Sequence, residues 1–135
     1  ETNMDKIEKS SEEWRAELAP DVYHITREAG TERPFSGQYN HFDAAGDYHC
    51  ACCGAFLFKS QQKFDSHCGW PAFFEQAEPQ STYRVRDLSH GMVREEVRCR
   101  RCDAHLGHVC PDGPKPTGER YCINSLAMAF EAESK

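Results

Sequence analysis

Two Cys-x-x-Cys pairs, Cys50/Cys53 and Cys99/Cys102, constrain this chain more than any other feature of its sequence. Two such pairs, each in a tight turn between strands, are a common way in which four thiolates reach one tetrahedral zinc ion. Both pairs follow a strand-like segment and precede Gly or Asp and then Ala. We therefore predict two similar turns, separated by residues 54–98, that meet at one zinc ion per chain. Four sulfurs leave no open coordination position, so this zinc would be structural.

Other assignments of these cysteines are open at this point. Either pair could close a disulfide instead of binding a metal. Cys52 lies inside the first pair, and adjacent thiols are too cramped to share one ion, so we expect Cys52 to be a bystander. A local set of two cysteines and two histidines could also bind a metal without the first pair. That set is Cys99, Cys102, His105 and His108.

The composition argues against several classes of partner. Hydrophobic residues make up 39% of the 135 residues, which is enough for a core without a disulfide scaffold. The net charge of −6 argues against nucleic acid, whose phosphates favour a basic face. No run approaches the roughly 18 apolar residues of a membrane span, and no signal segment opens the sequence. We expect a cytoplasmic monomer, and a targeting segment ahead of Met4 stays open.

Apolar and polar residues are arranged as in a mainly β fold with short N-terminal helices. Ser10 begins a capping box, and Pro20 ends that helix and suits the start of another, so residues 5–30 are expected to form a helical cover. Residues 39–130 alternate in short runs broken by turn residues, and we expect them to form the β core of a single domain, residues 1–135. The predicted strands are 48–51, 56–59, 72–75, 83–87, 93–98, 105–109 and 120–130.

The last of these strands carries a cysteine in a suggestive setting. Alternation along a strand places Arg120, Cys122 and Asn124 on one face. A guanidinium beside a thiol favours the thiolate, which is the nucleophilic form of cysteine. The competing interpretation is that Cys122 is a small buried hydrophobic residue, as most free cysteines are.

A second cysteine lies on an irregular segment. Gly69 and Pro71 flank Cys68 and Trp70 and prevent regular structure there. A thiol on such a loop can move toward a partner, and Trp70 can present an apolar wall. The alternative is a core tryptophan beside a buried thiol.

Several motifs along the chain combine Cys, His, Gly and Trp in a fixed order. They are Gly30-Thr31-Glu32-x-Pro34-Phe35-Ser36-Gly37, Phe64-Asp65-Ser66-x-Cys68-Gly69-Trp70-Pro71, Asp87-x-Ser89-His90-Gly91-Met92, His105-Leu106-Gly107-His108-Val109, Asp112-Gly113-Pro114 and Gly118-Glu119-Arg120-Tyr121-Cys122-Ile123-Asn124-Ser125. Together with the two metal pairs, they resemble the B-type methionine sulfoxide reductases from about residue 12 to residue 130.

The resemblance implies two small antiparallel sheets, a few N-terminal helices and a zinc site. It also implies thiol-dependent reduction of methionine-R-sulfoxide, free or in oxidised proteins and peptides. By position, Cys122 corresponds to the catalytic cysteine and Cys68 to the resolving cysteine, with thioredoxin as an expected reductant. The residues that correspond to the substrate pocket are Trp70, His105, His108, Asp112, Arg120 and Asn124.

The chemistry implied by these positions is consistent with the side chains. Cys122 would attack the sulfoxide sulfur while His105 or His108 protonates the oxygen, releasing methionine and leaving a sulfenic acid. Cys68 would then condense with it to a disulfide. Cys110 stands where the family usually has an aromatic residue, so a further thiol near the site could divert this disulfide.

Two functions of other classes compete with this one. A zinc-ribbon-like binding module without catalysis would explain the four metal cysteines but not Cys68, Cys122 or the histidines. A zinc deaminase would need His-x-Glu and Pro-Cys-x-x-Cys, and neither occurs here.

Overall fold

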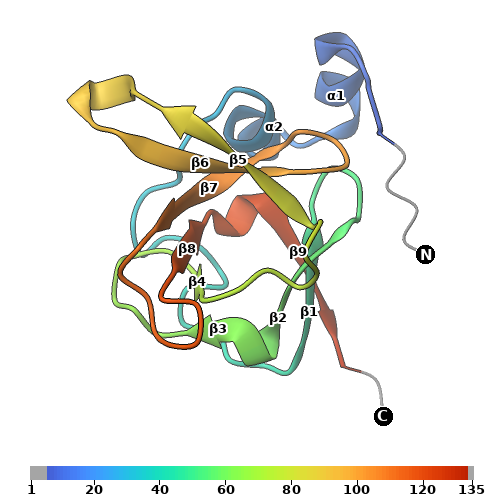
Figure 1. The fold of residues 1–135 in the computed structure, drawn as a ribbon. Helices are drawn as coiled ribbons and strands as arrows, with labels where there is room; N and C mark the ends of the chain where they lie inside the picture. The colour runs from blue at the N-terminus through green and yellow to red at the C-terminus, as the bar shows by residue number, and fades with distance from the viewer. Residues whose placement is uncertain (1–5, 134–135) are drawn as a thin grey trace.

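The computed structural model describes residues 6–133, which form two antiparallel sheets and two short helices (Figure 1). The helices are α1 (Ser11–Glu17) and α2 (Pro20–Arg27), and the 3-10 turns are η1 (Ser60–Gln62), η2 (Ser89–Gly91) and η3 (Ser125–Ala127). The strands are β1 (Gly46–Cys50), β2 (Phe56–Lys59), β3 (Lys63–Phe64), β4 (Ala72–Phe73), β5 (Thr82–Asp87), β6 (Arg94–Cys99), β7 (His105–Cys110), β8 (Arg120–Ile123) and β9 (Met128–Ala132). One sheet has the order β2-β1-β9 and the other β3-β4-β8-β7-β6-β5, which confirms the predicted mainly β fold.

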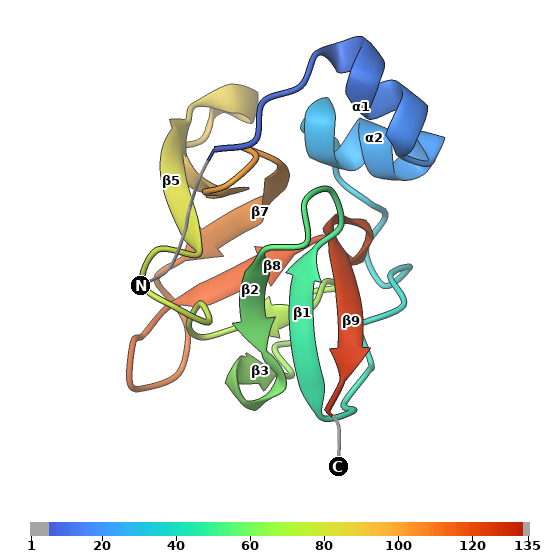
Figure 2. The same cartoon turned by 90° about the vertical axis from the view of Figure 1, so that its right-hand side faces the viewer.

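The two helices lie together at one end of the molecule (Figure 2). The Ser10 hydroxyl accepts from the Glu13 backbone N–H at 3.1 Å, and the Glu13 carboxylate accepts from the Ser10 N–H at 2.8 Å, which confirms the capping box. Trp14 is buried, and the Arg27 guanidinium lies 4.4 Å from the centre of its ring. This contact joins α1 to the end of α2, and Arg27 Nη2 also donates to the Cys102 carbonyl of the β core at 2.8 Å. No helix within residues 6–133 has the length and apolar character needed to span a bilayer.

Aromatic side chains fill the space between the two sheets. Phe58 of β2 stacks on Phe73 of β4 with ring centres 4.4 Å apart, and Tyr121 of β8 meets Phe58 edge-on at 5.6 Å. Tyr48 of β1 contacts Phe73 at 5.2 Å. These rings are almost completely buried, so their apolar surface is a main source of the energy that joins the sheets.

One predicted strand is wrong. Residues 120–130 do not form a single strand, because the chain leaves the six-stranded sheet after β8, turns through η3 and enters the three-stranded sheet as β9. The turn is stabilised from a distance, since the Glu32 carboxylate accepts hydrogen bonds from the backbone N–H groups of Ser125 (2.9 Å) and Leu126 (3.1 Å). Local alternation of residues contains no sign of such a tertiary contact.

A bulge in β7 brings two histidines to the same side of the sheet. Val97 pairs with Gly107 and Arg98 with His105, so Leu106 is an extra residue opposite β6. In a regular strand, His105 and His108 would face opposite sides. Their rings instead lie 5.6 Å apart, centre to centre.

Candidate active site and metal centre

Four cysteine sulfurs converge where the β1–β2 turn meets the β6–β7 turn. The Sγ atoms of Cys50, Cys53, Cys99 and Cys102 all lie within 4.8 Å of one another. The Cys50–Cys102 and Cys53–Cys99 separations are both 3.6 Å. Zinc–sulfur bonds of about 2.3 Å in a tetrahedron place the sulfurs about 3.8 Å apart. The cluster therefore has the dimensions of a four-cysteine metal site.

The two metal turns have the same backbone geometry. Cys50 N–H donates to Ala55 at 2.8 Å, and Cys99 N–H donates to Ala104 at 2.9 Å. The residue after each pair, Gly54 or Asp103, has a positive φ, 81° and 66° respectively. A repeated sequence thus makes a repeated turn, and a metal held there would tie the three-stranded sheet to the six-stranded one.

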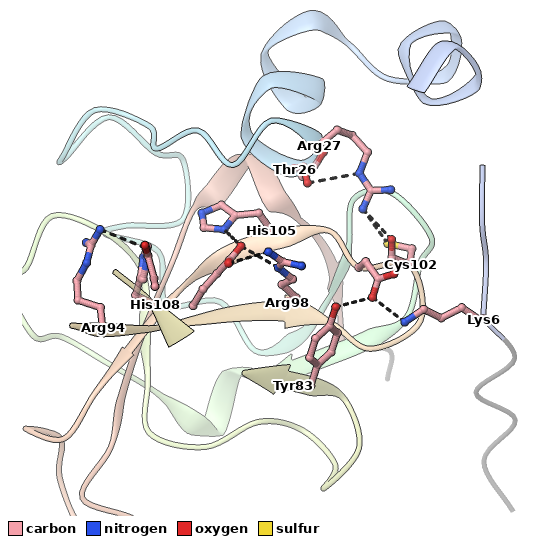
Figure 3. Close-up of polar contacts among 12 residues, drawn as sticks. Lys6, Thr26, Arg27, Tyr83, Arg94, Arg98, Cys102, His105 and His108 are labelled. Carbon is pink, nitrogen blue, oxygen red and sulfur yellow. Dashed lines mark hydrogen bonds and ion pairs between the residues drawn. The ribbon is translucent and has the colours of Figure 1, made fainter. Parts of the chain in front are cut away.

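The alternative metal assignments do not fit the contacts. Cys99 and Cys102 face the sulfurs of the first pair, and neither pair closes a disulfide. The two histidines of the local set turn to carboxylates instead, as described below. Cys52 is half-buried and lies outside the four-sulfur cluster. Arg27 Nη2 lies 2.8 Å from the carbonyl oxygen and 3.7 Å from the sulfur of Cys102, which places a cation beside the thiolates (Figure 3).

The second pair of thiols consists of one cysteine in the six-stranded sheet and one on a loop beside it. Cys122 is on β8, opposite Ala72 of β4 on one side and His108 of β7 on the other. Its Sγ is 3.1 Å from the Sγ of Cys68, which lies on the loop before β4. Arg120 Nη1 lies 2.8 Å from the same Cys122 sulfur. The structure thus brings together the two cysteines and the cation that the sequence singled out.

The two thiols share a proton unequally. A hydrogen bond from Cys122 lowers the pKa of Cys68 to about 5, against the opposing effect of burial. The same bond raises the pKa of Cys122 well above its usual value, with burial adding to it, because a second anion at 3.1 Å is repelled. Arg120 acts in the expected direction, lowering the pKa of Cys122, but its effect is smaller. The contact therefore favours a single negative charge on the pair, with Cys68 as the more acidic thiol.

Replacing Cys122 by alanine is therefore expected to raise the pKa of Cys68. In the parent protein, carboxamidomethylation of Cys68 by iodoacetamide should stay fast down to about pH 5, because the Cys68 thiolate persists to that pH. In Cys122→Ala the reaction should already slow below about pH 8, as for an ordinary thiol. Peptide mass spectrometry at each pH measures the two profiles, and unchanged titration of Cys68 would contradict the shared proton.

A cavity of about 180 Å³ opens beside Cys122. It is smaller than the roughly 300 Å³ or more of typical small-molecule pockets, so it suits the end of one side chain. Five of the residues chosen from the sequence line it, namely Trp70, His108, Arg120, Cys122 and Asn124, and the lining also includes Thr31, Arg94, Gly107 and Cys110. Asp112 lies outside the lining and holds Arg120 through two bonds of 2.8 and 3.0 Å. His105 also lies outside the lining, with its ring centre 5.6 Å from that of His108.

Glu32 positions two walls of this cavity. Its backbone oxygen accepts from Trp70 Nε1 at 3.0 Å, and its backbone N–H donates to Asn124 Oδ1 at 2.9 Å. Asn124 also donates to the Leu106 carbonyl at 3.0 Å. Because the Glu32 carboxylate binds η3, one buried residue fixes the tryptophan, the amide and the turn after Cys122. Glu32 belongs to the motif at residues 30–37 that resembles the reductase family, but the sequence alone assigned no role to it.

Carboxylates orient both histidines (Figure 3). His105 Nδ1 lies 2.7 Å from Glu96, and the buried Nε2 atom of His105 has no hydrogen-bond partner among the described residues. His108 Nε2 lies 2.8 Å from Asp87, which Arg94 approaches at 3.4 Å. Burial lowers the pKa of His108 despite Asp87. Burial also opposes ionisation of Glu96, but its bonds to His105 and Arg98 lower its pKa to about 2.

The sequence did not single out the two orienting carboxylates. Asp87 was part of a motif without an assigned role, and Glu96 had no signal beyond its place in a strand next to that of the histidines. The Glu96–His105 contact depends on the β6–β7 register and its bulge, and the Asp87–His108 contact depends on the pairing of β5 with β6 and of β6 with β7. A second hollow, of about 350 Å³, lies between residues 40–44 and 60–65, and none of the residues that line it is a cysteine.

Comparison with known proteins agrees with this geometry. The sequence profile of the SelR domain matches residues 18–132. The peptide methionine sulfoxide reductase MsrB of Pseudomonas putida (strain W619) is 58% identical over 128 residues, covering 95% of this chain and 96% of the relative. The protein of the same name from Pseudomonas entomophila (strain L48) is 59% identical over 125 residues, covering 93% of this chain and 95% of the relative.

Proposed function

The chain belongs to the SelR-domain family, as its similarity to curated MsrB proteins also shows, and we propose that it reduces methionine-R-sulfoxide to methionine. The substrates would be oxidised proteins and peptides, and the free amino acid as well. The observation that carries the proposal is the position of Cys122, at a cavity of one side chain's size, with Cys68 and Arg120 both in contact with its sulfur.

The first step is the attack of Cys122 on the sulfoxide sulfur. When substrate enters, the proton shared by the two thiols passes to Cys68, and Arg120 then stabilises the Cys122 thiolate. Asp112 holds Arg120 in this position. Trp70 offers an apolar surface for the S-methyl group, so only one epimer presents its sulfur to Cys122.

Protonation of the sulfoxide oxygen must accompany this attack, because the oxygen leaves the substrate sulfur as charge builds on it. His108 lines the cavity, and because burial lowers its pKa, its protonated form gives up a proton more readily than an ordinary imidazolium does. Its Nε2 is bound to the ionised Asp87, so Nδ1 is the nitrogen that would exchange the proton. The His105 ring packs edge-on against His108 at 5.6 Å, and Asn124 contributes a polar wall.

The remaining steps return the thiols to their starting state. The substrate leaves as methionine, and its oxygen stays on Cys122 as sulfenic acid. The Cys68 thiol attacks that sulfur, which forms the disulfide and releases water. A dithiol protein such as thioredoxin would then reduce the disulfide, and a reducing compartment such as the cytoplasm suits this cycle. We propose that the chain works as a monomer, because the residues of the cycle lie within one chain.

We assign one structural zinc ion to Cys50, Cys53, Cys99 and Cys102. The all-sulfur donor set and the 3.6 Å contacts between the two turns support zinc. When bound, the ion would supply a link between the sheets and no open position for substrate. A binding module without catalysis would need the same four cysteines but would not need the Cys68–Cys122 pair at a cavity.

An epimer-specific assay tests the function. With dithiothreitol as reductant, the protein is expected to reduce the R epimer of N-acetyl-methionine sulfoxide amide and to leave the S epimer. Chromatographic separation of the remaining epimers gives the result directly. Equal consumption of both epimers, or of neither, would rule out the proposed reaction.

A single-turnover experiment tests the role of Cys68. One equivalent of substrate without reductant should give one Cys68–Cys122 disulfide per chain, because these sulfurs are already 3.1 Å apart. Cys110 is diagonal to Cys122 in the β7–β8 ladder, and diagonal residues are about 7–8 Å apart, too far for a bridge without backbone movement. Disulfide mapping by peptide mass spectrometry distinguishes the two, and a Cys110–Cys122 bridge would reassign the resolving residue. The variant Cys110→Ser serves as the matched control and should form the same Cys68 bridge.

A further inference from the structure

Large apolar side chains are exposed around the candidate cavity. Four are strongly exposed among the described residues: Phe35 (62%), Leu88 (62%), Met92 (48%) and Val93 (74%). Scattered exposed apolar residues are ordinary, but here all four adjoin segments that line the cavity. We call these four side chains the apolar rim.

Phe35 forms one side of the rim. Its backbone N–H donates to the Gly69 carbonyl at 2.7 Å, next to the cavity residue Trp70. A Cβ added to Gly69 would lie 3.4 Å from Cε2 of Phe35, so the ring lies close to this loop. Phe35 has a φ of 65°, which is costly for a residue with a bulky side chain. The chain thus displays an apolar ring outward from a strained, hydrogen-bonded turn, a feature that often marks a binding site.

The connection between β5 and β6 forms the other side. Leu88, Met92 and Val93 lie between Asp87, which holds His108, and Arg94, which lines the cavity. The connection is braced by bonds from Ser89 N–H to Asp87 (2.9 Å) and from Met92 N–H to the Ser89 carbonyl (3.2 Å). Figure 1 shows η2 at the tip of the β5–β6 hairpin. The connection is therefore held in a defined conformation, and its last apolar residue, Val93, lines a hollow that shares Arg94 and Cys110 with the cavity.

We propose that the apolar rim binds the residues on either side of the oxidised methionine in an unfolded polypeptide, with a preference for apolar neighbours. This inference rests on the proposed function. The cavity accommodates one side chain, so the flanking residues of a polypeptide must lie outside it. Phe35 is bonded to the loop that carries Trp70, and Val93 lines an adjoining hollow that shares Arg94 and Cys110 with the cavity. Methionine is usually a core residue with apolar neighbours, and its oxidation disrupts cores and exposes those neighbours. Continuity with the cavity favours the substrate chain over other occupants.

The preference is measured with two blocked peptides that carry methionine-R-sulfoxide between leucines or between serines. The parent protein should reduce the leucine peptide with a kcat/KM about tenfold higher, as expected if the rim covers a few tens of Å² of apolar surface on each side. The double variant Phe35→Ser/Val93→Ser should bring this ratio to about one. Phe35→Leu/Val93→Ile keeps the apolar surface and should keep the ratio. Gln61→Ser, an exposed change in η1, is the control for substitution elsewhere and should also keep it.

Dithiothreitol is the reductant in these assays, so that docking of a protein reductant does not contribute. The parent protein could show equal kcat/KM for the two peptides and still reduce N-acetyl-methionine-R-sulfoxide amide. That result would rule out the proposed role of the apolar rim but not the proposed function. Loss of that blocked substrate's reduction in the parent would instead overturn the function. If the double variant slowed turnover only with thioredoxin, the rim would bind the reductant. Sedimentation showing a dimer that the double variant dissociates would assign the rim to a second copy of the chain.

Discussion

Cys122→Ser is expected to lower the turnover of methionine-R-sulfoxide by at least about 10³-fold, because the hydroxyl that replaces the thiol is a far weaker nucleophile at neutral pH. The loss should appear in kcat and in kcat/KM alike, since the attack itself is removed. The substitution deletes no large side chain, and β8 keeps both neighbouring strands, so the fold should remain.

The matched control is Cys52→Ser. This thiol is half-buried like Cys122 but lies inside the first metal turn, outside the cavity lining. The turnover of the Cys52→Ser variant should stay within about twofold of that of the parent protein. Both variants are compared by initial rates with dithiothreitol and by circular dichroism. Activity retained in a folded Cys122→Ser protein would remove Cys122 from the reaction.

Removal of the metal is expected to unfold the chain or to abolish its cooperative thermal transition. Structural zinc sites contribute apparent binding free energies of about 10–16 kcal/mol, which is as large as the total stability of a typical domain, about 5–15 kcal/mol. The four sulfurs come from turns in different sheets, so without an ion four thiols are left crowded at the junction.

A chelator titration followed by circular dichroism measures this effect, with metal content determined on the same samples. Cys99→Ser should lose most of its metal and most of its stability. Cys52→Ser should keep one zinc per chain, because its sulfur is not one of the four that converge. If Cys52→Ser lost the metal while Cys99→Ser retained it, Cys52 would be the ligand and Cys99 would not.

The sequence predicted the parts of this structure that depend on local residues. The metal turns were predictable because a Cys-x-x-Cys pair followed by Gly or Asp already describes a tight turn, and both positive φ values follow from it. The capping box at Ser10 and the helix start at Pro20 are local in the same way. Alternation also placed Arg120 and Cys122 side by side, as their 2.8 Å contact confirms.

Features that depend on distant residues could not be predicted in this way. The break between β8 and β9 depends on Glu32, which is more than 90 residues earlier in the chain. A bulge in β7 brings His105 to the same side of the sheet as His108, which alternation cannot show. The pKa of Cys122 was expected to be low because Arg120 is its neighbour in sequence, but Cys68 dominates it from a separate loop.

The placement of β8 determines which part of the site moves during a catalytic cycle. Cys122 is anchored on an interior strand, hydrogen-bonded to β4 and β7, whereas Cys68 lies on a loop whose backbone passes through positive φ at His67 and Gly69. Making and breaking a bond between the two sulfurs therefore requires the loop to move while the strand stays still. An inhibitor that held this loop with the Cys68 sulfur turned away from Cys122 would therefore prevent the disulfide and stop the cycle before regeneration.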